Sequence, residues 1–362
     1  MTEQSPPLPA QDCQAELVAR IEAARQTGQG LYISAGGSKR HLAGRNCDAQ
    51  QLDVSGHCGI VDYQPQELVL TARAGTPLTE IANALVGHGQ ALPCEPPLFS
   101  GRATLGGTLA CNLSGPARPW SGAIRDMVLG VKLISGKAEI LNFGGRVMKN
   151  VAGYDVSRLQ AGALGTLGVI SEVTLKVLPM AEQQLTLRYE MSATEAVTHM
   201  NQRAGEPKPL SAACWIDGHL YLRLSGTATA LDNTARVWGG EVMADAERFW
   251  SELRDMTLPF FAGDAPLWRF SLAASAPVNT TLGSTLIDWC GAQRWVRGEH
   301  AMDSLLRTAT AAGGHVTLFR GGDRNGEVKS PLTATEQRLQ QRLKQSFDPD
   351  GILNPGRLYS WL

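Results

Sequence analysis

Three glycine-rich segments hold the residues of this sequence that are best suited to bind a ligand. The first is Ala35-Gly36-Gly37-Ser38-Lys39, which directly follows a short predicted strand. Successive small residues let backbone N–H groups line a concave anion site, and the Lys39 ammonium group adds a positive charge. Such a loop suits a pyrophosphate, although a Gly-Gly pair of this kind is also common in ordinary turns.

The second segment runs from Thr104 to Asp126 and combines glycines with hydroxyl and amide side chains. Glycines allow the backbone to approach a flat ring or a phosphate closely, and threonine and asparagine side chains offer groups that fix its orientation. A loop-rich β region, with Asp126 as a surface ion-pair partner, explains the same residues without a ligand. The candidate binding residues here are Thr104, Gly106, Gly107, Thr108, Asn112, Gly115, Gly122 and Asp126.

The third segment has three glycines spaced by three residues before a predicted strand that begins at Val169. This spacing exposes backbone donors and acceptors along one side of the chain, as recognition of an adenine ring requires. Each segment is a weak signal alone, but their order, together with the terminal run Asn-Pro-Gly-Arg at 354–357, is specific. We therefore add as candidates Gly165, Gly168, Ile170, Asn354 and Gly356.

Several familiar nucleotide-binding and catalytic motifs are absent from the sequence. It contains no G-x-G-x-x-G, no P-loop and no G-x-S-x-G, which argues against a Rossmann enzyme, a P-loop ATPase and an α/β-hydrolase. The seven histidines include no pair at metal-ligand spacing, and the seven cysteines are widely spaced with no C-x-x-C pair. We therefore expect no metal site, no disulfide framework and no iron–sulfur cluster in this chain.

Composition excludes other classes of protein. With 33 basic and 34 acidic residues in 362, and 43% hydrophobic residues, the chain has the content of a globular protein and lacks the positive surface of a nucleic-acid-binding one. Its polar start lacks the pattern of a signal peptide, and no uncharged apolar run reaches the roughly 18 residues that a spanning helix needs. We expect a cytoplasmic protein, soluble or attached peripherally to the inner face of the membrane.

The elements that position these segments are mixed. Helices are predicted at 13–27 and from Pro77, a β-hairpin at 127–141, and a strand at 169–177 that alternates at period two. After Pro179, strands and helices alternate, which predicts a ferredoxin-like cap. We therefore predict an α+β protein with a two-lobed first domain at 1–179, a smaller cap domain at 180–330, and a C-terminal helix and tail at 331–362 that return to the first domain.

The run from Ala35 to Pro179 resembles the FAD-binding domain shared by vanillyl-alcohol oxidase and p-cresol methylhydroxylase flavoproteins. Nearly the whole chain, 31–358, is similar to the FAD-binding subunits of bacterial glycolate oxidases. The resemblance implies that the first segment holds the FAD pyrophosphate, the second lines the flavin and the third lies at the adenosine end. It also implies that Asn354 and Gly356 close over the isoalloxazine ring.

The same resemblance implies a reaction and partners. The reaction is two-electron oxidation of a small 2-hydroxy acid, glycolate to glyoxylate, with electrons leaving through the flavin to another subunit or acceptor. The implied partners are a sister FAD subunit and an iron–sulfur subunit, with membrane association only through that complex. Members that bind FAD covalently usually carry histidine in the first loop. This chain has Ser38 there, so we expect non-covalent FAD.

One departure from the family leaves the catalytic residues of this chain unassigned. Related 2-hydroxy-acid dehydrogenases carry an H-x-G-D-G-N-x-H motif in the cap, and this chain has none. An accessory subunit that holds FAD or acts as a scaffold, without its own turnover, is therefore the alternative. A reductase of the UDP-sugar enolpyruvate type is more distant, because the terminal 354–357 run and the cap disfavour it.

Two cap arginines, Arg269 and Arg320, are the candidates for holding a substrate carboxylate, because a planar guanidinium binds carboxylate through two parallel hydrogen bonds. Structural ion pairs would explain them equally well. Arginine is always protonated and so makes a poor base. From the sequence we therefore expect the isolated chain to bind FAD but to oxidise glycolate poorly.

Overall fold

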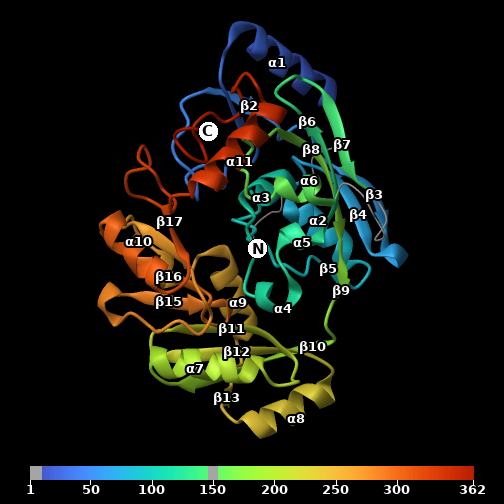
Figure 1. Ribbon diagram of the computed structural model, residues 1–362. Coiled ribbons are helices and arrows are strands. Elements are labelled where there is room, and N and C mark those ends of the chain that lie inside the picture. Colours follow the sequence, from blue (N-terminus) through green and yellow to red (C-terminus); the bar gives the residue numbers. More distant parts are fainter. Residues whose placement is uncertain (1–9, 146–153) are drawn as a thin grey trace.

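A five-stranded antiparallel sheet forms the core of the first domain in the computed structural model, which describes residues 10–145 and 154–362 (Figure 1). Helix α2 (Leu78–Val86) buries Leu78, Ile81 and Leu85 against it, a spacing that puts all three on one helical face. In spatial order the strands are β3 (Ile60–Gln64), β4 (Val69–Arg73), β8 (Val169–Lys176), β6 (Val128–Ile134) and β7 (Ile140–Gly144).

A short helix, α3 (Leu105–Cys111), stands where the sequence suggested only a glycine-rich loop. Leu105 and Leu109 are fully buried in the core of the first domain, and this burial offsets the low helix propensity of the two adjacent glycines. A Cβ atom at Gly106 would lie 2.6 Å from the Ala74 Cβ atom. The glycine therefore lets the helix lie directly against the end of β4.

A second lobe of the first domain is built on two parallel strands, β1 (Leu31–Ser34) and β2 (Gln50–Asp53). Helix α1 (Gln14–Thr27) covers them and buries Leu17, Ile21 and Ala24. The helix ends at Gly28, which adopts a left-handed conformation with φ of 67°. The lobe presents the C-terminal end of β1 to the five-stranded sheet.

The cap contains one antiparallel sheet of eight strands, in the order β13-β10-β12-β11-β15-β16-β14-β17. The first four, β10 (Gln183–Glu190), β11 (Leu210–Ile216), β12 (His219–Gly226) and β13 (Glu241–Val242), with α7 (Ala193–Ala204) and α8 (Ala228–Trp238), form a βαββαβ unit. The last four repeat its strand order, and a short 3₁₀ turn replaces the first helix. They are β14 (Leu267–Ser271), β15 (Thr285–Asp288), β16 (Gln293–Arg297) and β17 (His315–Arg320), with α10 (Met302–Ala311).

The cap is therefore ferredoxin-like, and it consists of one such unit joined side by side to a second unit of the same strand order, a doubling that the sequence prediction did not include. The second unit was missed because its first helix is replaced by the 3₁₀ turn Thr280–Leu282, which removes the alternation on which the prediction relied. The two units join where β11 pairs with β15. Figure 1 shows this sheet as a separate layer below the first domain.

The remaining elements are short or connect these parts. No helix among residues 10–145 and 154–362 is long and apolar enough to cross a membrane. The elements are β5 (Gln90–Ala91), β9 (Leu178–Pro179), α4 (Arg118–Ser121), α5 (Ile124–Met127), α6 (Tyr154–Leu159), α9 (Ala246–Asp255) and α11 (Ala334–Phe347), with 3₁₀ turns at Pro65–Glu67, Pro259–Phe261 and Trp289–Gly291.

The C-terminal segment returns to the first domain, as its red trace beside β2 shows in Figure 1. Helix α11 starts with a capping box in which Thr333 and Glu336 bond reciprocally. In its last turn, Lys344 Nζ donates to Thr166 O at 2.9 Å and pairs with Asp348 at 2.7 Å. Asp348 is fully buried, so this ion pair fixes the segment that follows it against the third glycine-rich segment.

We predict that Lys344→Ala strongly destabilises the protein. The substitution leaves the Asp348 carboxylate buried without its cation, a change that typically costs about 3 to 5 kcal/mol of unfolding free energy. Urea denaturation at neutral pH measures the loss. Arg248→Ala is the matched control, because Arg248 makes an exposed pair with Glu252 at the same i, i+4 spacing. An equal loss in both variants would contradict the prediction.

Candidate functional site

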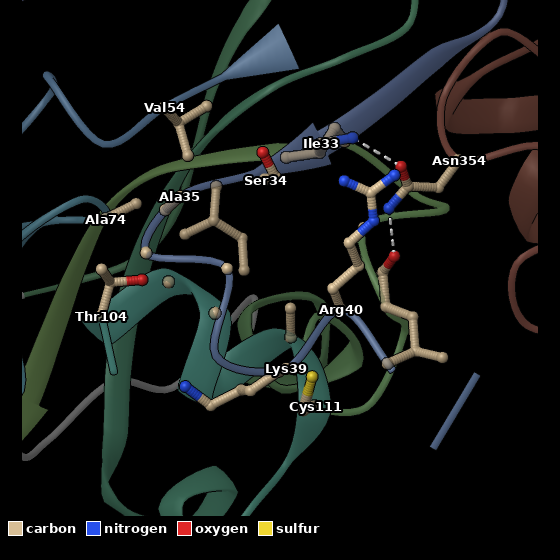
Figure 2. Close-up of a pocket in the computed structure, with 18 of the residues that line it drawn as sticks. Ile33, Ser34, Ala35, Lys39, Arg40, Val54, Ala74, Thr104, Cys111 and Asn354 are labelled. Carbon is tan, nitrogen blue, oxygen red and sulfur yellow. Dashed lines mark hydrogen bonds between the residues drawn. The ribbon is translucent and has the colours of Figure 1, made fainter. Parts of the chain in front are cut away.

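The main cavity lies where the two lobes of the first domain meet the C-terminal segment. The space between its atoms is about 730 Å³ when the part open to solvent is counted. Twelve of the residues predicted from the sequence line it: Ala35, Gly36, Gly37, Ser38, Lys39, Thr104, Gly106, Gly107, Gly165, Gly168, Ile170 and Asn354. Segments far apart in the sequence therefore meet around one space (Figure 2).

The first glycine-rich segment forms an open turn at the end of β1. The backbone N–H groups of Gly36, Gly37, Ser38 and Lys39 donate to no acceptor among the described residues. A Cβ atom at Gly36 would lie 2.0 Å from Arg102 O, whereas Gly37 has φ of +69° and open space beside it. Four consecutive free donors at a wall of the cavity are an arrangement that can bind an anion.

Lys39 adds a positive charge to this turn. Its side chain is 8% exposed, and its ammonium group reaches Ser38 Oγ at 3.3 Å and lies 5.4 Å from the centre of the Phe99 ring. Among the described residues no carboxylate pairs with it. Burial without such a partner lowers the pKa of Lys39 to about 8. A bound anion would stabilise the charged form and raise this pKa again.

Asn354 connects the opposite sides of the cavity. Its Oδ1 atom accepts a hydrogen bond from Ile33 N at 2.7 Å, and its Nδ2 atom donates to Leu164 O at 2.5 Å, as the dashed lines in Figure 2 show. Both polar ends of the side chain are therefore used within the protein. The amide fixes β1 against the third glycine-rich segment.

Six predicted cofactor-binding residues lie outside the lining of this cavity. Asp126 accepts a hydrogen bond from Ala123 N at 2.8 Å and so caps α5, next to the turn at Gly122. Gly356 accepts one from Arg45. The other three, Thr108, Asn112 and Gly115, belong to α3 or the turn after it.

Other residues line the cavity although the sequence did not suggest them. Most are neighbours of the predicted segments, and that adjacency was an available signal. Val54 and Ala74 had no such signal, because each follows a strand that only the tertiary fold brings to the cavity. The missed residues are Tyr32, Ile33, Ser34, Arg40, Val54, Ala74, Ala110, Cys111, Leu164 and Arg357.

A second, smaller cavity, about 360 Å³ when the space open to solvent is counted, lies between the turn at Leu113–Pro116 and the inner face of the cap sheet. Arg269 lines it, and its guanidinium has no acidic partner or hydrogen-bond acceptor among the described residues. Burial lowers the pKa of Arg269 to about 10. Arg320 lies elsewhere and donates to Phe261 O, which ties β17 to the turn at Pro259–Phe261.

The chain is similar to known proteins over almost all of its length. Residues 11–144 match a protein family described as an FAD binding domain. Glycolate oxidase subunit GlcE of Escherichia coli (strain K12) is 45% identical over 351 residues, which cover 97% of this chain and 99% of that protein. Glycolate oxidase subunit GlcD of Bacillus subtilis (strain 168) is 31% identical over 370 residues, covering 83% of this chain and 77% of the relative.

A solved structure of alkyldihydroxyacetonephosphate synthase shares the fold, with a TM-score of 0.64 at 14% identity over 94% of this chain and 75% of that one. The residues present fit FAD, because the free N–H groups at 36–39 and the buried Lys39 suit its phosphates. FAD is therefore the cofactor, and the α+β fold is that of a flavin-dependent oxidoreductase. The chain belongs to the family of FAD-binding glycolate oxidase subunits that includes GlcE.

Proposed function

We propose that this chain is the FAD-binding subunit of a complex that oxidises glycolate to glyoxylate. The observation that carries the proposal is the turn at 36–39, whose free backbone N–H groups line the main cavity in a chain 45% identical to a glycolate oxidase subunit. When bound, FAD supplies the two-electron oxidation. The protein binds and orients it, and places positive charge near the negative substrate.

Each wall of the main cavity has a separate part in this proposal. The turn at Ala35–Lys39 holds the pyrophosphate, because its donors are free and Lys39 lacks an acidic partner among the described residues. The face of α3 that carries Gly106 and Gly107 lets a flat ring approach the backbone. Gly165, Gly168 and Ile170 line the adenosine end. The Asn354 amide, bonded at both ends, keeps these walls at a fixed separation.

We further propose that FAD is held without a covalent bond. Ser38 stands where covalently flavinylated relatives carry histidine, and no described residue that lines the main cavity is a histidine. The Cys111 thiol does line it, but burial raises the pKa of this thiol and keeps it protonated and unreactive.

Electrons leaving the flavin need an acceptor in another subunit. Among the described residues, no group of three or more His, Cys, Asp or Glu side chains is arranged to hold a metal ion. Two relatives are named as subunits of one kind of oxidase. We propose that a sister FAD subunit and an iron–sulfur subunit receive the electrons, and that turnover takes place in this cytoplasmic complex, which attaches peripherally to the membrane.

An accessory role is the second candidate. The sequence lacks the H-x-G-D-G-N-x-H motif, and no described residue lining the second cavity is a histidine. On this alternative the chain holds FAD as an electron relay or a scaffold, and a sister subunit oxidises the substrate. The two candidates differ in one measurement, which is whether glycolate reduces the flavin bound to this chain.

We predict that Gly37→Asp lowers the FAD content of the purified protein at least tenfold. The variant introduces a carboxylate beside the free N–H groups, where it repels a pyrophosphate, and a side chain at a φ of +69°. Gly218→Asp is the matched control, because Gly218 has a φ of +78° and open space but lies in the β11–β12 turn of the cap. Absorbance at about 450 nm relative to 280 nm measures the content. Full flavin occupancy in Gly37→Asp would move the phosphate site elsewhere.

We predict that acid or heat releases all of the flavin. A non-covalent cofactor is lost when the fold that surrounds it unfolds, whereas a covalent one precipitates with the chain. Absorbance and fluorescence of the supernatant after trichloroacetic acid precipitation distinguish the two outcomes. Yellow colour retained in the washed pellet would contradict the non-covalent proposal.

We predict that glycolate bleaches the flavin of the purified complex, and that Gly37→Asp abolishes the part of the signal that belongs to this chain. Anaerobic stopped-flow absorbance follows the reduction. Size-exclusion chromatography of native extract is expected to show the chain in a complex with its partners. A chain found only as a free monomer, or a complex whose flavins stay oxidised in glycolate, would overturn the proposed function.

A further inference from the structure

The side chain of His57 connects the start of helix α1 to the five-stranded sheet. It is 1% exposed, and its two ring nitrogens bond to different elements. Nδ1 accepts a hydrogen bond from Cys13 N at 3.1 Å, and Nε2 lies 2.9 Å from Ser171 Oγ on β8. The next residue, Cys58, bonds through its backbone to Gln11, so the segment before α1 is held at the same place.

These bonds determine which nitrogen of the ring carries the proton. A backbone N–H group can only donate, so Nδ1 accepts from Cys13 N and is unprotonated. The ring proton is therefore on Nε2 and is donated to Ser171 Oγ, whose own hydroxyl group donates to Gln14 Oε1 at 3.2 Å. This chain of hydrogen bonds is complete only while the imidazole of His57 is neutral.

A second proton on His57 disrupts this arrangement for two reasons. It is placed on Nδ1 and faces the Cys13 N–H group, so two donors meet in a buried place. It also brings a full positive charge to the N-terminus of α1, which is the positive end of the helix dipole. Burial lowers the pKa of His57, in agreement with this geometry.

Asp12 offers the protonated ring a different partner. Its Oδ1 atom lies 3.6 Å from His57 Nδ1 and accepts a hydrogen bond from Gln14 N at 3.0 Å, at the first turn of α1. Its Oδ2 atom lies 3.4 Å from Arg73 Nη2. The Asp12 side chain is exposed and so is free to turn toward an imidazolium. The first turn of α1 then loses two bonds, those of Cys13 N and Gln14 N.

The other charged and titratable groups around His57 do not replace it as the group that changes charge. Glu172 on β8 and Lys132 on β6 form an ion pair at 2.6 Å. Burial raises the pKa of the Cys13 thiol, which therefore stays protonated. Glu16, in the first turn of α1, is exposed. Histidine is the side chain whose ordinary titration range lies between pH 5 and 8.

The backbone around His57 supports one wall of the main cavity. The His57 N–H group donates to Val54 O at 3.1 Å, and its carbonyl accepts from Gly75 N at 2.9 Å. On β8, Ser171 O accepts from Ala74 N at 2.7 Å. Val54 and Ala74 line the main cavity and are labelled in Figure 2. The residues bonded to His57 are thus part of a wall of the proposed FAD site or adjoin it.

We propose that His57 is a pH-sensitive latch: in its neutral form it fastens the start of α1 to β8 and to this cavity wall, and in its protonated form it releases them. Acidification then loosens α1 from the β1–β2 lobe that it covers, and FAD dissociates more readily. The inference rests on the part of the proposed function that places FAD in the main cavity, and it does not depend on the substrate.

The first test is hydrogen–deuterium exchange of the purified FAD-loaded protein between pH 5 and 7.5, corrected for intrinsic rates. The latched form excludes a proton that the open form binds, so the latch is fully stable above about pH 6.5 and loses stability below it. In wild type we expect the opening constant of the amides at 13–17 to rise by up to about tenfold per pH unit below pH 6.5. In His57→Asn it should stay constant, because Asn accepts from Cys13 N but does not titrate.

Two further variants protect this test against a folding artefact. His88→Asn is the matched control, because His88 is exposed and its ring only contacts Tyr63 edge-on at 5.3 Å. It should keep the wild-type profile. Asp12→Asn retains an oxygen for Gln14 N but removes the charge that favours an imidazolium, so the rise should continue to lower pH than in wild type. Opposite responses of His57→Asn and Asp12→Asn distinguish a latch from a general loss of stability.

The second test follows FAD release after dilution, by flavin fluorescence, at pH 5.5 and 7.5. The ratio of the two release rates should be at least about threefold larger in wild type than in His57→Asn. Lys39 also changes charge with pH, but it contributes equally to both proteins.

The outcomes of the two tests separate the latch from the proposed function. Equal exchange profiles in wild type and His57→Asn overturn the latch. Different exchange profiles with equal FAD release ratios overturn its link to the cofactor. A protein that purifies without flavin and does not bind added FAD overturns the proposed cofactor site, whereas the exchange profile still tests the latch.

Discussion

One amide group holds the main cavity open at a fixed width. Asn354 accepts from Ile33 N on one wall and donates to Leu164 O on the other, residues that are 321 and 190 positions away in the chain. The cavity therefore does not exist until the C-terminal segment has returned to the first domain. Closing such long loops costs conformational entropy, and Lys344 with Asp348 helps to offset that cost by fixing the segment from the other side.

The buried cations of the molecule fall into two kinds. Lys344 has a buried carboxylate and two carbonyl oxygens as partners, and its role is structural. Lys39 is also buried and Arg269 is half-buried, yet among the described residues neither has an acidic partner. The fold thus carries a desolvation cost at two places. Each place borders a cavity, where the negative charges of a cofactor or a substrate would offset that cost.

The doubled cap sheet determines the geometry of the second cavity. Its two halves join where Cys214 pairs with Asp288, and the chain then turns sharply, with positive φ at both Trp289 and Cys290. In this turn Trp289 Nε1 donates to Gly115 O of the first domain at 3.0 Å. The contact fixes the domains to each other next to the Asp288 carboxylate. The distance across the second cavity thus depends on the same turn that holds this carboxylate.

The sequence by itself determined the local elements and the chemistry of the first segment. The helix at Gln14–Thr27 and the strand at Val169–Lys176 follow from periodicity rules that act within a few residues. The turn at 35–39 could be predicted because successive small residues expose backbone donors whatever surrounds them.

Tertiary structure decided which of these groups meet. Residues that are neighbours in the sequence do not by themselves form the wall of a cavity, and they do not by themselves bury a group and so shift its pKa. Gly115 and Asp126 look alike as candidates in the sequence, yet the first lines the cavity between the domains and the second caps a helix. Asp288 carries no motif at all. Its distinction arises from burial on the inner face of an eight-stranded sheet, next to Gln293 and in one cavity with Arg269, and that burial depends on pairing between strands far apart in the chain.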